Sequence, residues 1–262
     1  MASGKIIQDG DFRYIVNGNG TTVLLLLHGL FGATGNFESL QSHFSKSYKV
    51  VTPLLPIMEL PLKKLSLQGL VDYIHDFVTK QNFSSLNVIG NSLGGHLAQL
   101  FTLQYPELVS SVTLTGSSGL FESTMGSTFP KRGDYEFVKK KAQSTFYDAS
   151  LATKEVVDEV FETVNNRSKA IRVVMTAKSA IRNNLEDKIH KITKPVLLVW
   201  GKQDNITPSW VGEKFHSLLP NSELVLLDEC GHAPMMEKPD KFNVILENFL
   251  KTIAHKATIK VQ

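Results

Sequence analysis

The sequence predicts an α/β protein in which helices flank a mostly parallel sheet. Short apolar runs that are typical of strands alternate with longer segments whose apolar residues recur at helical spacing. One run, residues 23–27, is apolar throughout, as expected for a strand that helices cover on both faces. Sheets of this kind bind ligands at the carboxyl ends of their strands, so functional residues are expected directly after the apolar runs.

The first half of the chain alternates strands and helices. Its predicted strands are short, apolar and bounded by polar residues or glycine: 12–16, 23–27, 48–52, 86–89 and 109–114. Its predicted helices carry apolar residues on one side, as Leu70, Val71, Ile74 and Phe77 do, and cover 37–44, 67–78 and the segment after Gly95.

No strand is predicted between residues 120 and 191. This part of the chain instead contains three charged segments that are compatible with helices, at 134–145, 154–165 and 168–182. The alternation then resumes with a strand at 195–200, a helix at 208–219, a strand at 223–227 and a final helix at 238–251. The sequence therefore predicts a core made of residues 1–119 and 192–262, interrupted by a helical insertion at 120–191.

The segment Gly90-Asn91-Ser92-Leu93-Gly94-Gly95 lies between a predicted strand and a predicted helix. A serine at such a sharp turn sits in strained backbone with its hydroxyl exposed, and the flanking positions need glycine because a Cβ atom would collide with neighbouring backbone. Ser92 is therefore the candidate nucleophile.

A serine hydroxyl needs a base within hydrogen-bond reach and a carboxylate that orients this base. Asp204 follows the strand at 195–200, and His232 follows the strand at 223–227. The order serine, acid, histidine is that of one large class of serine hydrolases. Asp228 is the alternative acid, although its place on the same loop as His232 suits the role less well.

Acyl transfer also builds negative charge on an oxygen, which backbone amides can stabilise. The amide of Leu93 at the start of its helix and the amide of Leu30 after the strand at 23–27 are predicted donors. Phe31, His96 and Ala233 are candidates for the wall of a substrate pocket. Core packing is the alternative for Phe31, and a structural place at the helix start is the alternative for His96.

The amino-acid composition excludes several classes of binding partner and of metal site. With 28 basic and 25 acidic residues the net charge is only +3, so neither nucleic acid nor a membrane surface is an expected partner. Cys230 is the single cysteine, which excludes an intrachain disulfide and a cysteine metal cluster. No signal-peptide pattern opens the chain, and no apolar run approaches the roughly 20 residues of a membrane span. We expect a cytoplasmic monomer or homodimer that acts on a small molecule without a metal.

Taken together, four motifs resemble those of the α/β-hydrolase superfamily across nearly the whole chain: HGLFG at 28–32, GNSLGG at 90–95, GKQDNITP at 201–208 and CGHAPMMEKPDKF at 230–242. The resemblance implies a core sheet of eight mostly parallel strands, a helical cap at about 120–190 and no cofactor. A serine at 92, rather than aspartate, separates the chain from the haloalkane dehalogenase and epoxide hydrolase branches.

The predicted activity is hydrolysis of a carboxylic ester or related acyl bond in a small, largely apolar substrate. The GNS and CGH segments also resemble carbon-carbon bond hydrolases of meta-cleavage pathways, which usually carry tryptophan where this chain has Ala233. A lyase of the menaquinone-pathway type is similar too, but it normally has a basic residue at the position of His96. A non-catalytic receptor on the same scaffold is a third, less favoured alternative.

Overall fold

The computed structural model describes residues 4–32, 34–121 and 133–259, so residues 122–132 of the predicted insertion lie outside the described part. One sheet contains eight strands in the order β1-β2-β4-β3-β5-β6-β7-β8. Pairing is parallel from β4 to β8, whereas β1 and β2 pair antiparallel at one edge. The predicted eight-stranded, mostly parallel sheet is thus confirmed. The strands are β1 (Ile6–Asp9), β2 (Phe12–Asn17), β3 (Val23–Leu27), β4 (Lys49–Pro53), β5 (Leu86–Asn91), β6 (Val109–Thr115), β7 (Val196–Gly201) and β8 (Ser222–Leu227).

The strand register brings the predicted functional segments to one edge of the sheet. Leu27, the last residue of β3, pairs with Gly90 near the end of β5, and Asn91 pairs with Thr115, the last residue of β6. Gly201 and Leu227, which end β7 and β8, pair with each other. Because all these strands run in the same direction, the loops that follow them emerge side by side.

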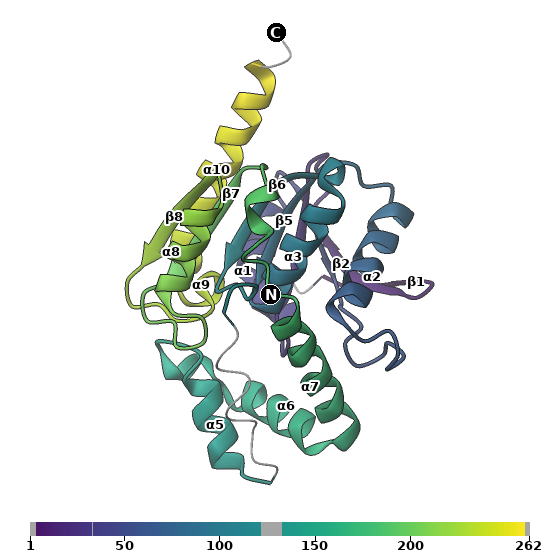
Figure 1. Cartoon of the computed structure of the whole chain (residues 1–262), viewed down its shortest axis with the longest axis vertical. Coiled ribbons are helices and arrows are strands. Elements are labelled where there is room, and N and C mark those ends of the chain that lie inside the picture. Colours follow the sequence, from purple (N-terminus) through teal and green to yellow (C-terminus); the bar gives the residue numbers. More distant parts are fainter. Residues whose placement is uncertain (1–3, 33, 122–132, 260–262) are drawn as a thin grey trace.

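Helices cover both faces of the sheet, as Figure 1 shows. Leu25 and Leu27 of β3 belong to an apolar cluster with helices α2 (Leu67–Lys80), α3 (Leu93–Gln104) and α8 (Ser209–Leu218). Leu24 and Leu26 belong to a second cluster with helices α1 (Glu38–Phe44), α9 (Pro234–Glu237) and α10 (Pro239–Ile259). Successive side chains of a strand point to opposite faces, so a strand between two helical layers is apolar at every position.

Among the described strands and α-helices, one strand and one helix were not predicted from the sequence. The edge strand β1 leaves Ile6 and Ile7 exposed at 45% and 40%, so it has no buried face that could produce an apolar alternation. The helix α9 is a single turn, too short to show a helical period.

The part of the insertion that the structure describes is helical. Helices α5 (Tyr135–Gln143), α6 (Lys154–Asn165) and α7 (Arg167–Arg182) lie between β6 and β7 in the chain and form a group away from the sheet layers (Figure 1). The side chains of Asp134, Thr153 and Asn166 accept hydrogen bonds from the first turns of these helices and so cap them.

Two hydrogen bonds join α7 to the core. Arg172 donates to the carbonyl oxygen of Leu60 at 2.6 Å, and the Ser179 hydroxyl accepts from the amide of Leu67 at 2.9 Å. These bonds link the insertion to the segment that leads into α2.

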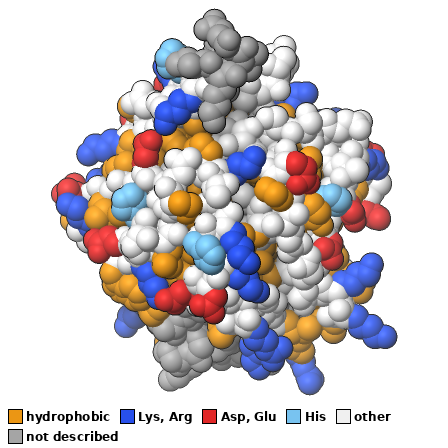
Figure 2. Space-filling view, turned by 45° about the horizontal axis from the view of Figure 1, so that its top comes forward, with side chains coloured by type: hydrophobic (Ala, Val, Ile, Leu, Met, Phe, Trp, Pro, Cys, Tyr) orange, Lys and Arg blue, Asp and Glu red, His pale blue; other side chains and the backbone are white. Residues whose placement is uncertain are grey.

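The surface carries no large area of one charge on the face that Figure 2 shows, where acidic and basic side chains are interspersed. Within the described residues, no helix combines the length and the apolar character that a bilayer crossing requires.

The close contact between α3 and β3 predicts a site that tolerates no side chain. A Cβ atom at Gly94 would lie 1.9 Å from the carbonyl oxygen of Leu27, so Gly94→Ala must displace backbone. We expect a loss of about 3 kcal/mol in the free energy of unfolding, measured by urea denaturation. Gly35→Ala is the matched control, because nothing described lies within 4 Å of its Cβ position. Equal stabilities of the two variants would contradict the packing argument.

Candidate active site

Ser92 occupies the turn between β5 and α3 in a conformation that favours glycine. Its φ is 55° and its ψ is −119°, and surrounding hydrogen bonds hold it there. The Ser92 amide donates to the carbonyl oxygen of Thr115 at 3.1 Å, while the Ser92 carbonyl accepts from the amides of Gly95 and Ser118. The residue is partly exposed between buried neighbours, so its side chain is accessible from the cavity described below.

Asp204 lies in the loop after β7 and is 4% exposed. Its Oδ1 accepts hydrogen bonds from the amides of Ile206 and Thr207 at 2.8 and 2.9 Å. Its Oδ2 accepts from the Thr207 hydroxyl and faces His232 Nδ1, both at 2.9 Å. Four donors thus converge on one carboxylate, which fixes its orientation.

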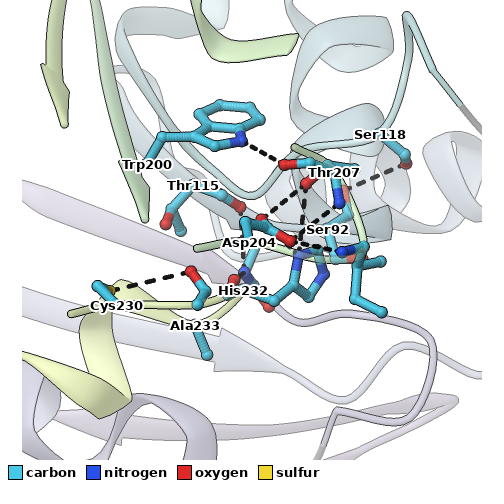
Figure 3. A network of polar contacts seen from close by, with 12 residues as sticks. Ser92, Thr115, Ser118, Trp200, Asp204, Thr207, Cys230, His232 and Ala233 are labelled. Atoms are coloured by element: carbon cyan, nitrogen blue, oxygen red, sulfur yellow. Dashed lines mark hydrogen bonds and ion pairs between the residues drawn. The ribbon is translucent and has the colours of Figure 1, made fainter. Parts of the chain in front are cut away.

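His232 follows β8 and is 6% exposed, and Figure 3 shows it gathered with Ser92, Asp204 and Thr207. Its Nδ1 faces Asp204, a hydrogen-bond acceptor, so the proton of the neutral ring belongs on Nδ1 and Nε2 is left as the basic nitrogen. Asn91 donates from Nδ2 to the His232 carbonyl at 3.1 Å and to that of Thr115 at 3.0 Å, tying the histidine loop to the turn at Ser92. Asp228, the alternative acid, is instead paired with Lys202 at 2.7 Å and has a largely exposed side chain.

The loop after β3 approaches Ser92 closely. A Cβ atom at Gly29 would lie 3.3 Å from the Cβ of Ser92, so glycine permits the approach. His28 fixes this loop through Nδ1, which donates to the Gly29 carbonyl at 2.8 Å, and Nε2, which accepts from the Leu55 amide at 3.1 Å. Burial lowers the pKa of His28, and a neutral ring suits this pair of contacts. Leu30 follows on this loop, and Leu93 begins α3 directly after Ser92.

A cavity of about 460 Å³ contains Ser92 and His232 in its wall. Helices of the insertion contribute Val138, Ala142, Val156, Val160, Val173 and Ala177 to this wall. Phe31 and Ala233, which the sequence predicts for the wall of a substrate pocket, also line it, as does Leu30, a predicted amide donor. Among the described lining residues, Lys141 is the only lysine or arginine and Glu159 the only carboxylate. The cavity is therefore mostly apolar next to a small polar centre.

His96 is not among the residues that line this cavity, so the structure does not support its predicted place in the pocket. The side chain is fully buried, with Nε2 donating to the Asn183 carbonyl at 2.8 Å and Nδ1 facing the Ser118 hydroxyl at 3.5 Å. Burial lowers the pKa of His96 to about 4. His96 thus connects α3 with Asn183, the residue that follows α7.

Thr207 and Asn91 were missed as site residues in the sequence analysis. Thr207 stands three residues after Asp204, a spacing at which an aspartate commonly accepts bonds from its own following backbone. Asn91 directly precedes the candidate nucleophile, but its role depends on the distant loop at 232 and has no local signal. The indole of Trp200 donates to the Thr207 carbonyl at 2.8 Å and anchors this residue in turn.

No group of three or more His, Cys, Asp or Glu in the described parts of the chain is arranged to hold a metal ion. Burial, followed by the charge of Glu237, raises the pKa of the Cys230 thiol to about 12, which makes it a poor ligand or nucleophile.

Comparisons with known proteins identify the family of the fold. A family model described as alpha/beta hydrolase fold matches residues 22–239. The structure of MGS-MChE2, an alpha/beta hydrolase enzyme from a metagenome of lagoon sediments at Mar Chica, Morocco, is 38% identical, has a TM-score of 0.79, and covers 95% of this chain and 98% of its own.

Two curated relatives are each 27% identical to this chain. One is a 2-hydroxy-6-oxononadienedioate/2-hydroxy-6-oxononatrienedioate hydrolase of Burkholderia vietnamiensis, with 94% of both chains covered. The other is monoacylglycerol lipase ABHD6 of Bos taurus, with 88% of this chain and 75% of the relative covered.

Lowering the pH should reduce the free energy of unfolding, because the buried ring of His96 resists protonation in the folded chain. Because the pKa of about 4 in the folded chain lies below the ordinary value of 6.5, this group contributes stability that is complete above pH 6.5 and lost as the pH falls toward 4. We expect His96 to account for about 3 kcal/mol of the unfolding free energy that is lost between pH 7 and pH 4, measured by urea denaturation across that range.

His96→Gln keeps an amide donor for the Asn183 carbonyl but cannot titrate, so its stability should depend less steeply on pH. His255→Gln, at an exposed position of α10, is the control and should retain the profile of the unaltered chain. A His96→Gln profile as steep as that of the unaltered chain would refute the assignment.

Proposed function

Because the chain belongs to the α/β-hydrolase family, we propose that it is a serine hydrolase that cleaves a carboxylic ester or related acyl bond of a small, largely apolar substrate. The observation that carries the proposal is the contact between His232 Nδ1 and Asp204 Oδ2 at 2.9 Å, in a cavity whose wall also contains Ser92. An imidazole held by a carboxylate beside a strained, accessible serine is suited to nucleophilic catalysis.

In the proposed reaction the Ser92 hydroxyl oxygen attacks the carbonyl carbon of the substrate, and His232 Nε2 accepts the hydroxyl proton. The tetrahedral intermediate then collapses, the carbon-oxygen bond to the alcohol breaks, and His232 returns the proton to the departing oxygen. Water repeats the sequence on the acyl-enzyme, releases the acid and restores Ser92. Asp204 holds the ring and stabilises its positive charge without becoming protonated.

The amides of Leu30 and Leu93 are proposed to stabilise the oxyanion. Leu93 supports this role because it is the first residue of α3, where backbone N–H groups lack partners within the helix. Leu30 supports it because its loop approaches Ser92 closely, so that a Cβ atom at Gly29 would make a tight contact of 3.3 Å with the Cβ of Ser92. Loss of one such donor typically costs about a hundredfold or more in rate.

The cavity supports an apolar substrate and a cap function for the insertion. Side chains of α5, α6 and α7 form much of the wall opposite the catalytic residues. We therefore propose that residues 120–191 cap a core formed by 1–119 and 192–262. Such a wall excludes water and selects substrates by shape, while the residues at 92, 204 and 232 determine the reaction type.

Carbon-carbon bond hydrolysis is the second candidate, because one curated relative is named for cleavage of a dienedioate. A dioate carries two carboxylates, which require cationic or hydrogen-bonding partners when they enter an apolar cavity. Lys141 is the only lysine or arginine in the described wall, so the lining favours an uncharged ester. Turnover of dienoic keto acids beside p-nitrophenyl esters distinguishes the two activities.

Covalent labelling tests the nucleophile. A fluorophosphonate probe should add one adduct to the unaltered chain at Ser92, detected by intact mass and peptide mapping, and Ser92→Ala should abolish it.

Asp204→Asn should lower kcat by about a thousandfold or more, because the ring of His232 loses its orienting acceptor. Asp228→Asn is the matched control and should remain near full activity, since that carboxylate pairs with Lys202. A folded chain that turns over no ester and takes no label would overturn the proposal and favour a non-catalytic receptor.

Substrate length should depend on the wall of α6. Val160 lines the cavity, and Val160→Phe fills space there. We expect kcat/KM for p-nitrophenyl octanoate to fall about fivefold or more relative to that for p-nitrophenyl acetate, because the longer chain loses more of its apolar contact. The acetate ester is the internal control. A uniform change for both esters would show that Val160 does not contact the acyl chain.

A further inference from the structure

Glu237 is the last residue of α9. It makes contacts that the proposed roles of Ser92, Asp204 and His232 do not explain. Its Oε1 accepts hydrogen bonds from the amides of Gly231 at 3.0 Å and Ala233 at 3.1 Å. Its Oε2 accepts from the Gly231 amide at 3.0 Å and from the amide of Tyr147 at 2.7 Å. One carboxylate therefore binds the two residues that flank His232 and a residue that follows α5.

The backbone of His232 itself is held by two further bonds. Its amide donates to the Thr145 carbonyl at 2.9 Å, and its carbonyl accepts from Asn91 Nδ2 at 3.1 Å. Three successive amides, from 231 to 233, thus point to acceptors supplied by Glu237 and by Thr145. The backbone that carries the imidazole is consequently fixed on both sides.

Gly231 allows the histidine loop and the segment 145–147 to touch. A Cβ atom at this position would lie 2.8 Å from the Thr145 carbonyl oxygen and 2.8 Å from the Tyr147 nitrogen. Thr145 and Phe146 also line the cavity that contains Ser92. The wall of the cavity and the loop of His232 are therefore in direct backbone contact, and Glu237 spans the two.

The energetic argument favours a carboxylate at this position. Hydrogen bonds from backbone amides to an ionised acceptor are shorter and roughly twice as strong as those between neutral groups. Proton transfer requires His232 Nε2 within hydrogen-bond reach of the Ser92 hydroxyl, and a misplacement of about 1 Å can cost about a hundredfold in rate. Hydrogen bonds that restrain the loop carrying His232 therefore favour proton transfer.

We propose that Glu237 is a positioning residue for His232, whose carboxylate fixes the loop 230–233 against the cavity-lining segment 145–147. The proposal rests on the proposed function, since it assigns His232 the role of base. Glu237 does not contact the substrate in this account. It acts by holding the imidazole between Asp204 and Ser92.

Glu237→Gln tests the role with little change in volume. The glutamine side chain keeps one acceptor oxygen, but its NH₂ group must face a backbone N–H donor. At least one of the hydrogen bonds that Glu237 accepts is therefore lost. We expect kcat for a p-nitrophenyl ester to fall about tenfold or more while KM changes less than about threefold, and the rate of fluorophosphonate labelling should fall in parallel. Glu237→Asp keeps the charge on a shorter stem and should retain more activity than Glu237→Gln.

Asp240→Asn is the matched control. It neutralises an exposed carboxylate only three residues away, in the first turn of α10, and should leave kcat within about twofold of the unaltered chain. Thermal denaturation of each variant shows whether the protein remains folded at the assay temperature.

A spectroscopic readout separates positioning from general stability. The proton on His232 Nδ1, shared with Asp204, gives a far-downfield proton resonance that His232→Ala removes. In folded Glu237→Gln this resonance should broaden or shift, whereas Asp240→Asn should leave it unchanged. A folded Glu237→Gln variant with unaltered kcat and resonance would overturn the proposal, as would activity lost only in proportion to the unfolded fraction.

Failure of the proposed function has a different signature. In that case the unaltered chain itself neither hydrolyses esters nor takes the label at Ser92. The His232 resonance still reports whether Glu237 positions the ring, because it is measured without substrate. If Glu237→Gln does not fold, Glu237→Asp is compared with Asp240→Asn instead, and it should show a smaller but measurable loss of kcat and a shift of the resonance that Asp240→Asn lacks.

Discussion

The structure depends on the close approach of the amino terminus of α3 to β3 and β5. A Cβ atom at Gly90 would lie 2.4 Å from the Gly94 carbonyl oxygen, and one at Gly94 would lie 1.9 Å from that of Leu27. Only glycine at both positions lets the chain reverse within this space, and the reversal forces Ser92 to a φ of 55°. The strained turn is compensated by hydrogen bonds from neighbouring strands and loops, so the position of Ser92 is a consequence of backbone packing.

The histidine side of the site is held by a different kind of interaction. Asp204 and Glu237 each collect several donors on one carboxylate, the first around the imidazole of His232 and the second around the backbone that carries it. Polar groups with every bond made are held rigidly, because any displacement leaves a donor or acceptor without a partner. Two carboxylates, one in the loop after β7 and one at the end of α9, thus define where His232 lies relative to Ser92.

The insertion both lines the cavity and contacts the loop of His232. Its helices provide an apolar wall for the cavity, and the segment after α5 accepts a hydrogen bond from the amide of His232. Its far end is bound to α3 through His96 and the Asn183 carbonyl, and to the region before α2 through Ser179. The wall of the cavity is consequently built into the same hydrogen-bond framework as the groups that are proposed to act on a substrate.

Much of this architecture was predictable from the sequence, because its signals are local. The strands at 23–27 and 86–89, the helices between them, and the glycine spacing around Ser92 follow from apolar periodicity and steric limits that act over a few residues. The edge strand β1 was not predictable, because among the described strands it pairs only with the adjacent β2 and has no buried face. The hydrogen bond of His96 to the Asn183 carbonyl and that of Glu237 to the Tyr147 amide were not predictable either, since both depend on partners far away in the chain. The amino-acid sequence by itself determined the elements and the candidate residues 92, 204 and 232. Only the tertiary structure decided which acid meets the histidine and what encloses the serine, because strand register and loop packing set those distances.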